Sequence, residues 1–159
     1  MSYFEDLSNY SYCCGIENSK NVGWLDVAHP FPKGKVSEDF INKLWVYLKV
    51  DLMIMRGFHV CNLCHDPHNG IFIASRNDES LKLGFAEIRV LSEDSNVVYA
   101  APDLIYHYIL DHSYKPPEEF VKAVLKGPKP GSIEYEKFLS TFDVEERQYY
   151  PPTIRRYQG

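Results

Sequence analysis

The chain lacks the features that would place it in a membrane or in the secretory pathway. No apolar run approaches the roughly 20 residues that cross a bilayer. The start, Met-Ser-Tyr-Phe-Glu-Asp-Leu, has neither a basic region nor an apolar signal core. With 159 residues, 45% of them hydrophobic and 25% charged, the composition is that of one globular domain. The sequence therefore predicts a single cytoplasmic domain that does not enter a membrane.

Cysteine is too scarce for a disulfide framework. The chain has four cysteines, and thiols stay reduced in the cytoplasm, so each is expected to be a free thiol or a metal ligand. Cys13 and Cys14 are adjacent, and adjacent thiols cannot easily chelate one ion together. We interpret this pair as packing residues, which leaves Cys61 and Cys64 for metal chemistry.

An excess of basic charge is missing too. Seventeen Lys and Arg residues stand against 22 Asp and Glu residues, and the net charge of −5 makes nucleic acid an unlikely partner and suits a basic one. No Gly-rich phosphate loop follows a strand, and Gly-x-Ser-x-Gly is absent. Acidic residues that could form an acid–base pair with His29 or Arg89 are better explained as solvated faces; they are Glu5, Asp6, Asp26, Glu87 and Asp103.

The first half of the chain combines irregular segments with one helix. Residues 1–35 are rich in Tyr, Asn, Ser, Gly and Pro, which predicts an irregular wrap with at most short strands. Ser37 is a helix cap, and it is followed by an apolar face made of Phe40, Ile41, Leu44, Trp45 and Leu48. Residues 71–74 form a possible short strand, whereas the polar stretch 75–80 is expected to be a loop.

The second half predicts a hairpin and then helices. Residues 86–91 and 97–100 flank a polar turn and read as two half-buried strands. A helix is expected to start at Pro102 and Asp103, a second at Pro117, and a short third after Ser132 that uses Tyr135, Phe138, Leu139 and Phe142. Residues 143–159 are expected to be an extended tail. The fold class is therefore α+β, with three or four helices.

One constellation carries recognisable metal chemistry. Cys61 and Cys64 form C-x-x-C at a turn, and His107 and His112 form H-x-x-x-x-H at the end of the helix that follows the hairpin. Two thiolates and two imidazoles at such spacings can share one tetrahedral zinc ion. The order of knuckle, hairpin and helix is that of zinc-finger-like and treble-clef-like cores. Four protein ligands would close the shell, which predicts a structural Zn²⁺ ion and no catalysis by it.

Alternatives to this ligand set lie close in the sequence. His59, His65 and His68 crowd the same region, and any of them could replace one of the helical histidines as a ligand. Two cysteines at this spacing also arise by chance, and His107 on an apolar helix could be an ordinary core residue.

Several motifs resemble those of a family of small bacterial proteins of unknown function. They are Tyr3-Phe4-Glu5-Asp6-Leu7, Gly23-Trp24-Leu25-Asp26 with His29-Pro30-Phe31-Pro32, Gly57-Phe58-His59 before the C-x-x-C pair, and Tyr99-Ala100-Ala101-Pro102 running into Leu104-Ile105-Tyr106-His107-Tyr108. The resemblance extends to about Leu125. It implies a shared fold in which Cys61, Cys64, His107 and His112 form the metal site.

The chain is also similar in type to bacterial immunity proteins, which are small, acidic, single-domain proteins without catalytic motifs. That analogy implies a non-catalytic protein that occludes the active site of a basic toxin domain encoded nearby, of the nuclease or ADP-ribosyltransferase type. Two other functions stay open. One is a metal-dependent hydrolase or nuclease in which His59, His29 or Glu87 transfers protons, and the other is a zinc-containing nucleic-acid-binding module.

Overall fold

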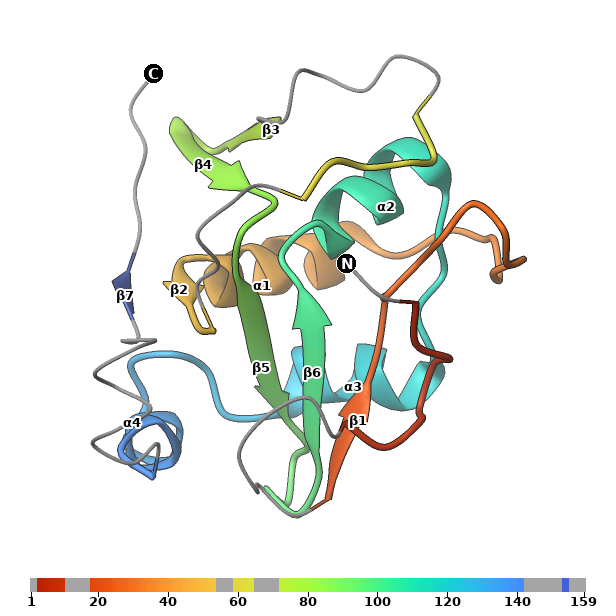
Figure 1. The fold of residues 1–159 in the computed structure, drawn as a ribbon. Helices are drawn as coiled ribbons and strands as arrows, with labels where there is room; N and C mark the ends of the chain where they lie inside the picture. The colour runs from red at the N-terminus through yellow and green to blue at the C-terminus, as the bar shows by residue number, and fades with distance from the viewer. Residues whose placement is uncertain (1–2, 11–17, 54–58, 65–71, 142–152, 155–159) are drawn as a thin grey trace.

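The computed structural model describes residues 3–10, 18–53, 59–64, 72–141 and 153–154. Within them the fold is α+β, with four helices and three small sheets (Figure 1). The helices are α1 (Glu38–Leu48), α2 (Ile105–His112), α3 (Glu118–Lys126) and α4 (Ile133–Leu139). No helix in these residues is both long enough and apolar enough to cross a membrane.

The central sheet has the strand order β1-β6-β5. The predicted hairpin is confirmed as β5 (Glu87–Leu91) and β6 (Val98–Pro102), which are antiparallel. The N-terminal wrap contributes one short strand, β1 (Ser19–Asn21), which lies parallel to β6. Every residue of β5 and β6 is buried, so both faces of this hairpin are covered.

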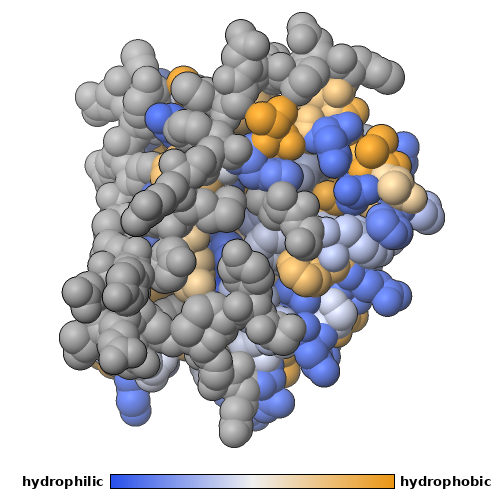
Figure 2. Space-filling model, viewed as in Figure 1, coloured by the Kyte–Doolittle hydropathy of each residue, from blue (hydrophilic) through white to orange (hydrophobic). Residues whose placement is uncertain are grey.

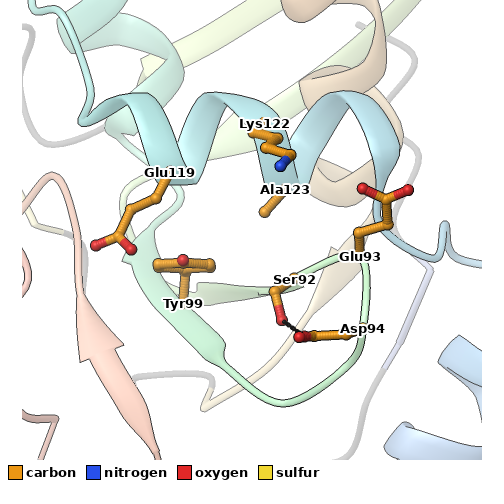
Figure 3. A pocket seen from close by; sticks show the side chains of 7 residues that line it. All are labelled: Ser92, Glu93, Asp94, Tyr99, Glu119, Lys122 and Ala123. Carbon is orange, nitrogen blue, oxygen red and sulfur yellow. Dashed lines mark hydrogen bonds between the residues drawn. The ribbon is translucent and has the colours of Figure 1, made fainter.

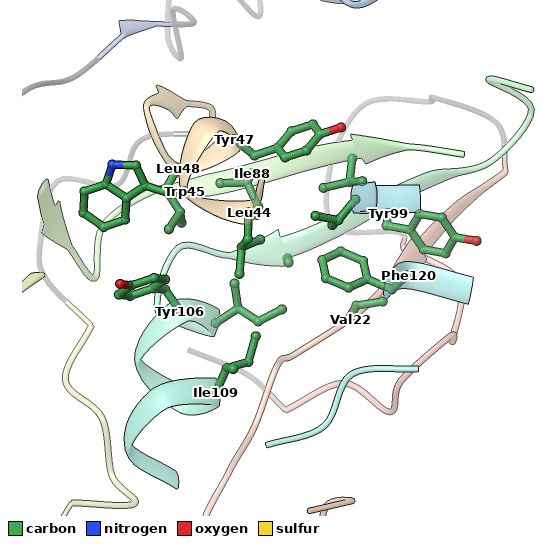
Figure 4. Packing of buried hydrophobic residues seen from close by; sticks show 14 of the residues in the cluster. Val22, Leu44, Trp45, Tyr47, Leu48, Ile88, Tyr99, Tyr106, Ile109 and Phe120 are labelled. Atoms are coloured by element: carbon green, nitrogen blue, oxygen red, sulfur yellow. The ribbon is translucent and has the colours of Figure 1, made fainter. Parts of the chain in front are cut away.

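Helices α1 and α3 cover one face of the sheet. The Ser37 side chain accepts a hydrogen bond from the Phe40 N–H at 3.1 Å and caps α1 as predicted. All five predicted apolar residues of α1 are buried. Figure 4 shows Leu44 and Leu48 of α1 over Ile88 of β5.

Aromatic rings extend the same core to either side. Phe120 of α3 packs edge-on against Tyr99 of β6, with 5.9 Å between ring centroids (Figure 4). Trp45 of α1 lies 5.2 Å from the Tyr106 ring of α2. These contacts fix α1, α2 and α3 around one hydrophobic core.

The polar stretch 75–80 is a hairpin, so the loop expected there is wrong. Strands β3 (Phe72–Arg76) and β4 (Glu79–Leu83) pair through it in full register. The turn residues Asn77 and Asp78 have φ angles of 51° and 62°, the left-handed conformation that Asn and Asp tolerate in a tight hairpin turn. The hairpin is polar because most of its residues are half-buried or exposed.

Two helix starts differ from expectation. Pro102 ends β6, and α2 begins only at Ile105. Asp103 is therefore not a first-turn helix residue: it is fully buried, and its carboxylate accepts hydrogen bonds from the backbone N–H groups of Gly84, Phe85 and Ala86 at 2.8, 3.4 and 3.3 Å. Pro117 lies at the N-cap position of α3 rather than at its first helical position, and its side chain makes no capping hydrogen bond.

The C-terminal part is described only in places. Ser132 caps α4, and Tyr135 and Leu139 are buried as expected, whereas Phe142 lies outside the described residues. Most of the predicted extended tail, 143–159, also lies outside them. The exception is β7 (Thr153–Ile154), which pairs antiparallel with β2 (Val50–Asp51).

Candidate metal centre

The knuckle that carries Cys61 and Cys64 is anchored to the turn before β5. The His59 N–H donates a hydrogen bond to the Gly84 carbonyl oxygen. Gly84 has a φ of +105°, and a Cβ there would lie 2.7 Å from the His59 carbonyl oxygen. Because only glycine allows this approach, Gly84 sets the position of the knuckle. Figure 1 shows the segment 59–64 running beside α2.

Helix α2 supplies the two histidines. His107 lies within the helix and is 2% exposed, and His112 is its last residue. The chain turns directly after His112, because Ser113 adopts a left-handed conformation with a φ of 57° and its N–H bonds to the Tyr108 carbonyl oxygen. At this helix end the His112 ring lies next to the His107 ring, with 5.0 Å between the ring centroids.

The four predicted ligands meet at one point. One potential ligand atom from each of Cys61, Cys64, His107 and His112 lies within 4.8 Å of all the others. The Cys64 sulfur is 3.2 Å from His107 Nε2 and 3.4 Å from His112 Nε2, and the Cys61 sulfur is 3.5 Å from His112 Nε2. These residues lie close enough to hold a metal ion.

The spacing also agrees with tetrahedral coordination. Bond lengths of about 2.3 Å to sulfur and about 2.0 Å to nitrogen, at the tetrahedral angle, separate the two atoms by about 3.5 Å. The observed sulfur–nitrogen distances of 3.2 to 3.5 Å fall at or just below this value. These sulfur–nitrogen distances thus suit a bound ion.

A carboxylate orients one of the imidazoles from behind. Asp111 Oδ2 lies 2.7 Å from His107 Nδ1, the ring nitrogen that faces away from the sulfurs. A proton on Nδ1 leaves the lone pair of Nε2 directed at the cluster, which is the arrangement that metal-binding histidines use. The Phe72 ring of β3 lies 4.3 Å from the His107 ring and closes one side of the site.

The environment of Cys61 suits a metal better than a free thiolate. Burial raises the pKa of the Cys61 thiol to about 11, although the Leu63 and Cys64 backbone N–H groups, which lower the pKa, bond to its sulfur. The free thiol is therefore protonated at neutral pH. A divalent cation reverses this balance, because a coordinating thiol is deprotonated.

The other candidate ligands have different fates. Among the described residues, His59 does not join the cluster. His65 and His68 lie outside the described residues, as do Cys13 and Cys14. His29 is exposed and stacks on the Tyr3 ring with 3.8 Å between centroids.

The solvated-face interpretation is wrong for Glu87, which pairs with Arg89. Both side chains are buried, at 7% and 3% exposure, and Arg89 Nη1 donates to Glu87 Oε1 at 2.8 Å. Tyr10 completes the cluster: its hydroxyl donates to Glu87 Oε1 at 2.9 Å and accepts from Arg89 Nη2 at 3.0 Å. Glu87 is thus committed to an ion pair. Sequence reasoning missed this triad because Tyr10 comes from a distant segment.

A hollow on another face offers no comparable chemistry. It has a volume of about 300 Å³ and lies between the β5–β6 turn and α3 (Figure 3). Figure 3 draws a hydrogen bond from the Ser92 hydroxyl to the Asp94 carboxylate, at 2.7 Å. Both residues also accept backbone N–H groups of the turn, Ser92 from Val97 and Asp94 from Asn96. Their contact therefore closes the turn.

Fold and site together define an α+β domain with a Cys₂His₂ cluster able to hold a metal ion. Residues 2–125 match the model of a family described as a domain of unknown function, DUF7919. The chain belongs to this family, and all four residues of the cluster lie within the match. Comparisons with curated proteins and with solved structures gave no match.

Proposed function

We propose that Cys61, Cys64, His107 and His112 bind a structural zinc ion. The observation that carries this proposal is the convergence of two sulfurs and two imidazole nitrogens at tetrahedral spacing. Thiolate and imidazole ligands in a tetrahedral S₂N₂ set are typical of zinc, whereas magnesium and calcium take oxygen ligands. Four protein ligands leave no coordination position for a substrate or a reactive water. The ion would join the knuckle to α2.

Metal analysis of the purified protein tests the zinc centre. We expect one zinc per chain by plasma mass spectrometry, and loss of zinc together with a lower Tm in Cys64→Ser and His112→Asn. His29→Asn is the matched control, because it removes an exposed histidine outside the cluster. A chain that contains no zinc after refolding with zinc, and whose Tm is unchanged by the ligand substitutions, would refute the proposal.

We propose further that the zinc-stabilised domain is a non-catalytic binding protein that acts in the cytoplasm as an immunity protein. Three features support a binding role: the net charge of −5, the closed ligand set of the metal centre, and the commitment of Glu87 to a buried ion pair. An acidic protein is electrostatically complementary to the basic grooves of toxins that act on nucleic acids or nucleotides. The assignment to immunity proteins is an analogy with other small, acidic, single-domain proteins that lack catalytic motifs.

Co-expression with the C-terminal toxin domain encoded immediately upstream tests this role. We expect growth to be restored and a one-to-one complex to co-purify. An unrelated acidic protein of similar size is the control for non-specific charge effects. Absence of both rescue and complex would reject the immunity role without affecting the zinc proposal.

A further inference from the structure

A second cavity lies where the N-terminal segment meets the segment between β1 and α1. Its volume is about 230 Å³. Three aromatic residues, Tyr3, Phe4 and Phe31, line it together with two acidic residues, Glu5 and Asp6. In the view of Figure 2, hydrophobic residues gather at the upper right, on the side where α2 and the β1–α1 segment lie in Figure 1.

The cavity unites two motifs that the metal centre does not use. Residues 3–6 come from the Tyr-Phe-Glu-Asp-Leu motif, and residues 30–32 come from the His-Pro-Phe-Pro motif. The two segments are more than 20 positions apart in the sequence, and the fold brings both to the wall of one hollow. Two of the family-like motifs that lie outside the knuckle and α2 thus meet at this cavity.

Hydrogen bonds hold this cavity in shape. Asp6 Oδ1 accepts from the Gly23 N–H at 3.0 Å, and Asp6 Oδ2 accepts from the Tyr114 hydroxyl at 2.9 Å. The Phe4 N–H donates to the Trp24 carbonyl oxygen at 3.4 Å. The Phe31 ring packs edge-on against the Tyr114 ring, with 6.1 Å between centroids. The walls are therefore formed before any ligand binds, which reduces the entropy lost on binding.

The negative charge of the cavity is not balanced by a neighbour. Within the described part of the chain, neither Glu5 nor Asp6 forms an ion pair. Burial raises the pKa of Asp6, even though the Gly23 N–H and the Tyr114 hydroxyl, which lower it, both donate to the carboxylate. A cation in the cavity would offset the cost of this burial.

The aromatic walls favour the same kind of ligand. The faces of phenyl and phenol rings attract cations. The chain already shows this property at the cavity, because Lys33 Nζ lies 5.5 Å from the centroid of the Phe31 ring. Lys33 itself does not line the cavity.

We propose that this cavity binds the ammonium or guanidinium group of a lysine or arginine side chain presented by a basic protein partner. The volume lies below the roughly 300–1,000 Å³ of pockets that take drug-sized molecules and fits the end of one side chain. The proposal rests on the proposed function, because it assigns the partner's anchor to a place on this chain. The cation would be recognised by the carboxylates and by the faces of the aromatic rings together.

The test uses side-chain analogues and the zinc-loaded full chain. Nα-acetyl-arginine amide and Nα-acetyl-lysine amide are titrated while ¹H–¹⁵N NMR spectra are recorded. We expect shifts of the Trp24 indole and of backbone amides around the cavity, with Kd on the order of 1 mM. The corresponding amides of citrulline and norleucine, which are neutral analogues of arginine and lysine, report binding without charge. Butylammonium shows whether a free amine of the same chemistry binds as well as the amino-acid derivative does.

Variants locate the site. Glu5→Gln removes an exposed charge that the fold does not require, and Phe31→Leu removes the ring; each is expected to weaken binding about two- to fivefold. Glu93→Gln, in the hollow beside α3, is the matched control and should leave Kd unchanged. The proposal is overturned if neither cationic analogue shifts these signals, or if the neutral analogues bind equally well.

Failure of this inference is distinguishable from failure of the immunity role. Analogue binding does not need the toxin, so binding without growth rescue would keep the cavity and reject the immunity role. Growth rescue that is unaffected by Phe31→Leu, in a chain that binds no analogue, would keep the immunity role and reject the cavity. Butylammonium binding that exceeds that of both amino-acid derivatives at least tenfold would reassign the cavity to a small free amine and overturn the protein-anchor proposal.

Discussion

Replacement of Arg89 by methionine is expected to cost about 3 kcal/mol of unfolding free energy. Arg89 is buried and bonds to Glu87, to the Tyr10 hydroxyl and to the Ile88 carbonyl oxygen, at 2.8, 3.0 and 3.2 Å. Removal of one partner of a buried pair costs roughly 3–5 kcal/mol, because the other charge stays buried without compensation. The lower end applies, since the Glu87 carboxylate keeps its 2.9 Å hydrogen bond from Tyr10. The corresponding fall in Tm is roughly 6–12 °C.

The double variant separates the ion pair from packing. Replacement of both Glu87 and Arg89 by methionine removes both charges and fills similar volume, which is often neutral for stability. The Tyr10 hydroxyl then loses both partners, so a net cost of about 1–2 kcal/mol is expected. The double variant should therefore be more stable than Arg89→Met alone. Urea unfolding monitored by the fluorescence of Trp24 and Trp45, both buried, measures the wild type, Arg89→Met, Glu87→Met and the double variant.

A surface ion pair between β3 and α1 provides the control. Arg76 Nη2 contacts Glu38 Oε2 at 2.6 Å, but the Glu38 side chain is 78% exposed. Exposed pairs contribute roughly 0–1 kcal/mol, so Arg76→Met should have a small effect. If Arg89→Met costs no more than Arg76→Met, or if the Glu87 and Arg89 substitutions are additive, the assigned role of burial is wrong.

Three further outcomes follow from single contacts. Asp111→Ala should weaken zinc binding about tenfold in a chelator competition, because His107 loses the carboxylate that orients it. Ser37→Ala should cost about 1 kcal/mol in urea unfolding, since the cap of α1 is lost. The Asn96 N–H, and after it the Ser92 hydroxyl, lowers the pKa of Asp94 in the folded protein. The ionised Asp94 carboxylate therefore stabilises the fold above the unfolded pKa of about 3.9, and this stabilisation is lost as pH falls through the folded pKa. Asp94→Asn should therefore lose less stability than the wild type between pH 5 and pH 2, and an identical acid profile would contradict this.

Local signals in the sequence predicted the metal cluster and the main elements. The Ser37 cap and the spacing of apolar residues after it define α1, because both act within one or two turns of helix. The polar turn between two apolar runs defines β5 and β6. The Cys61 and Cys64 pair is equally local, and zinc geometry restricts which histidines can join it. The cysteine pair, the histidine pair and each of these elements were recognised from residues close in the chain, and zinc chemistry then joined the two pairs across 43 or more positions.

The misses are contacts between distant segments or within exposed strands. Glu87 and Arg89 alternate with apolar residues and look like a solvated face, but Tyr10, 77 positions earlier than Glu87, covers them. Asp103 resembles a helix start because nothing near it shows that the turn at Gly84 needs its carboxylate. The largely half-buried hairpin β3–β4 has little apolar alternation, and only its Asn77-Asp78 turn carried a signal.

The metal centre and the cavity lined by Tyr3 and Phe31 share structural supports, so zinc binding and ligand binding in the cavity are expected to be coupled. The Asn62 side chain, between the two cysteines, bonds to the Asp26 carboxylate, which also accepts the Ala28 N–H at 2.6 Å. Beyond His112 at the other end of the centre, Tyr114 donates to Asp6. We expect release of zinc to loosen both connections.

Nα-acetyl-arginine amide should therefore bind several-fold more weakly after chelation, and by linkage it should strengthen zinc binding by the same factor. Parallel titrations of zinc-loaded and chelated protein measure the first factor, and chelator competition with and without the amide measures the second. Equal Kd values in the two forms would show that the knuckle does not support the cavity. The two factors belong to one thermodynamic cycle, so unequal values would mean that one of the titrations had not reached equilibrium, as after irreversible loss of the chelated protein.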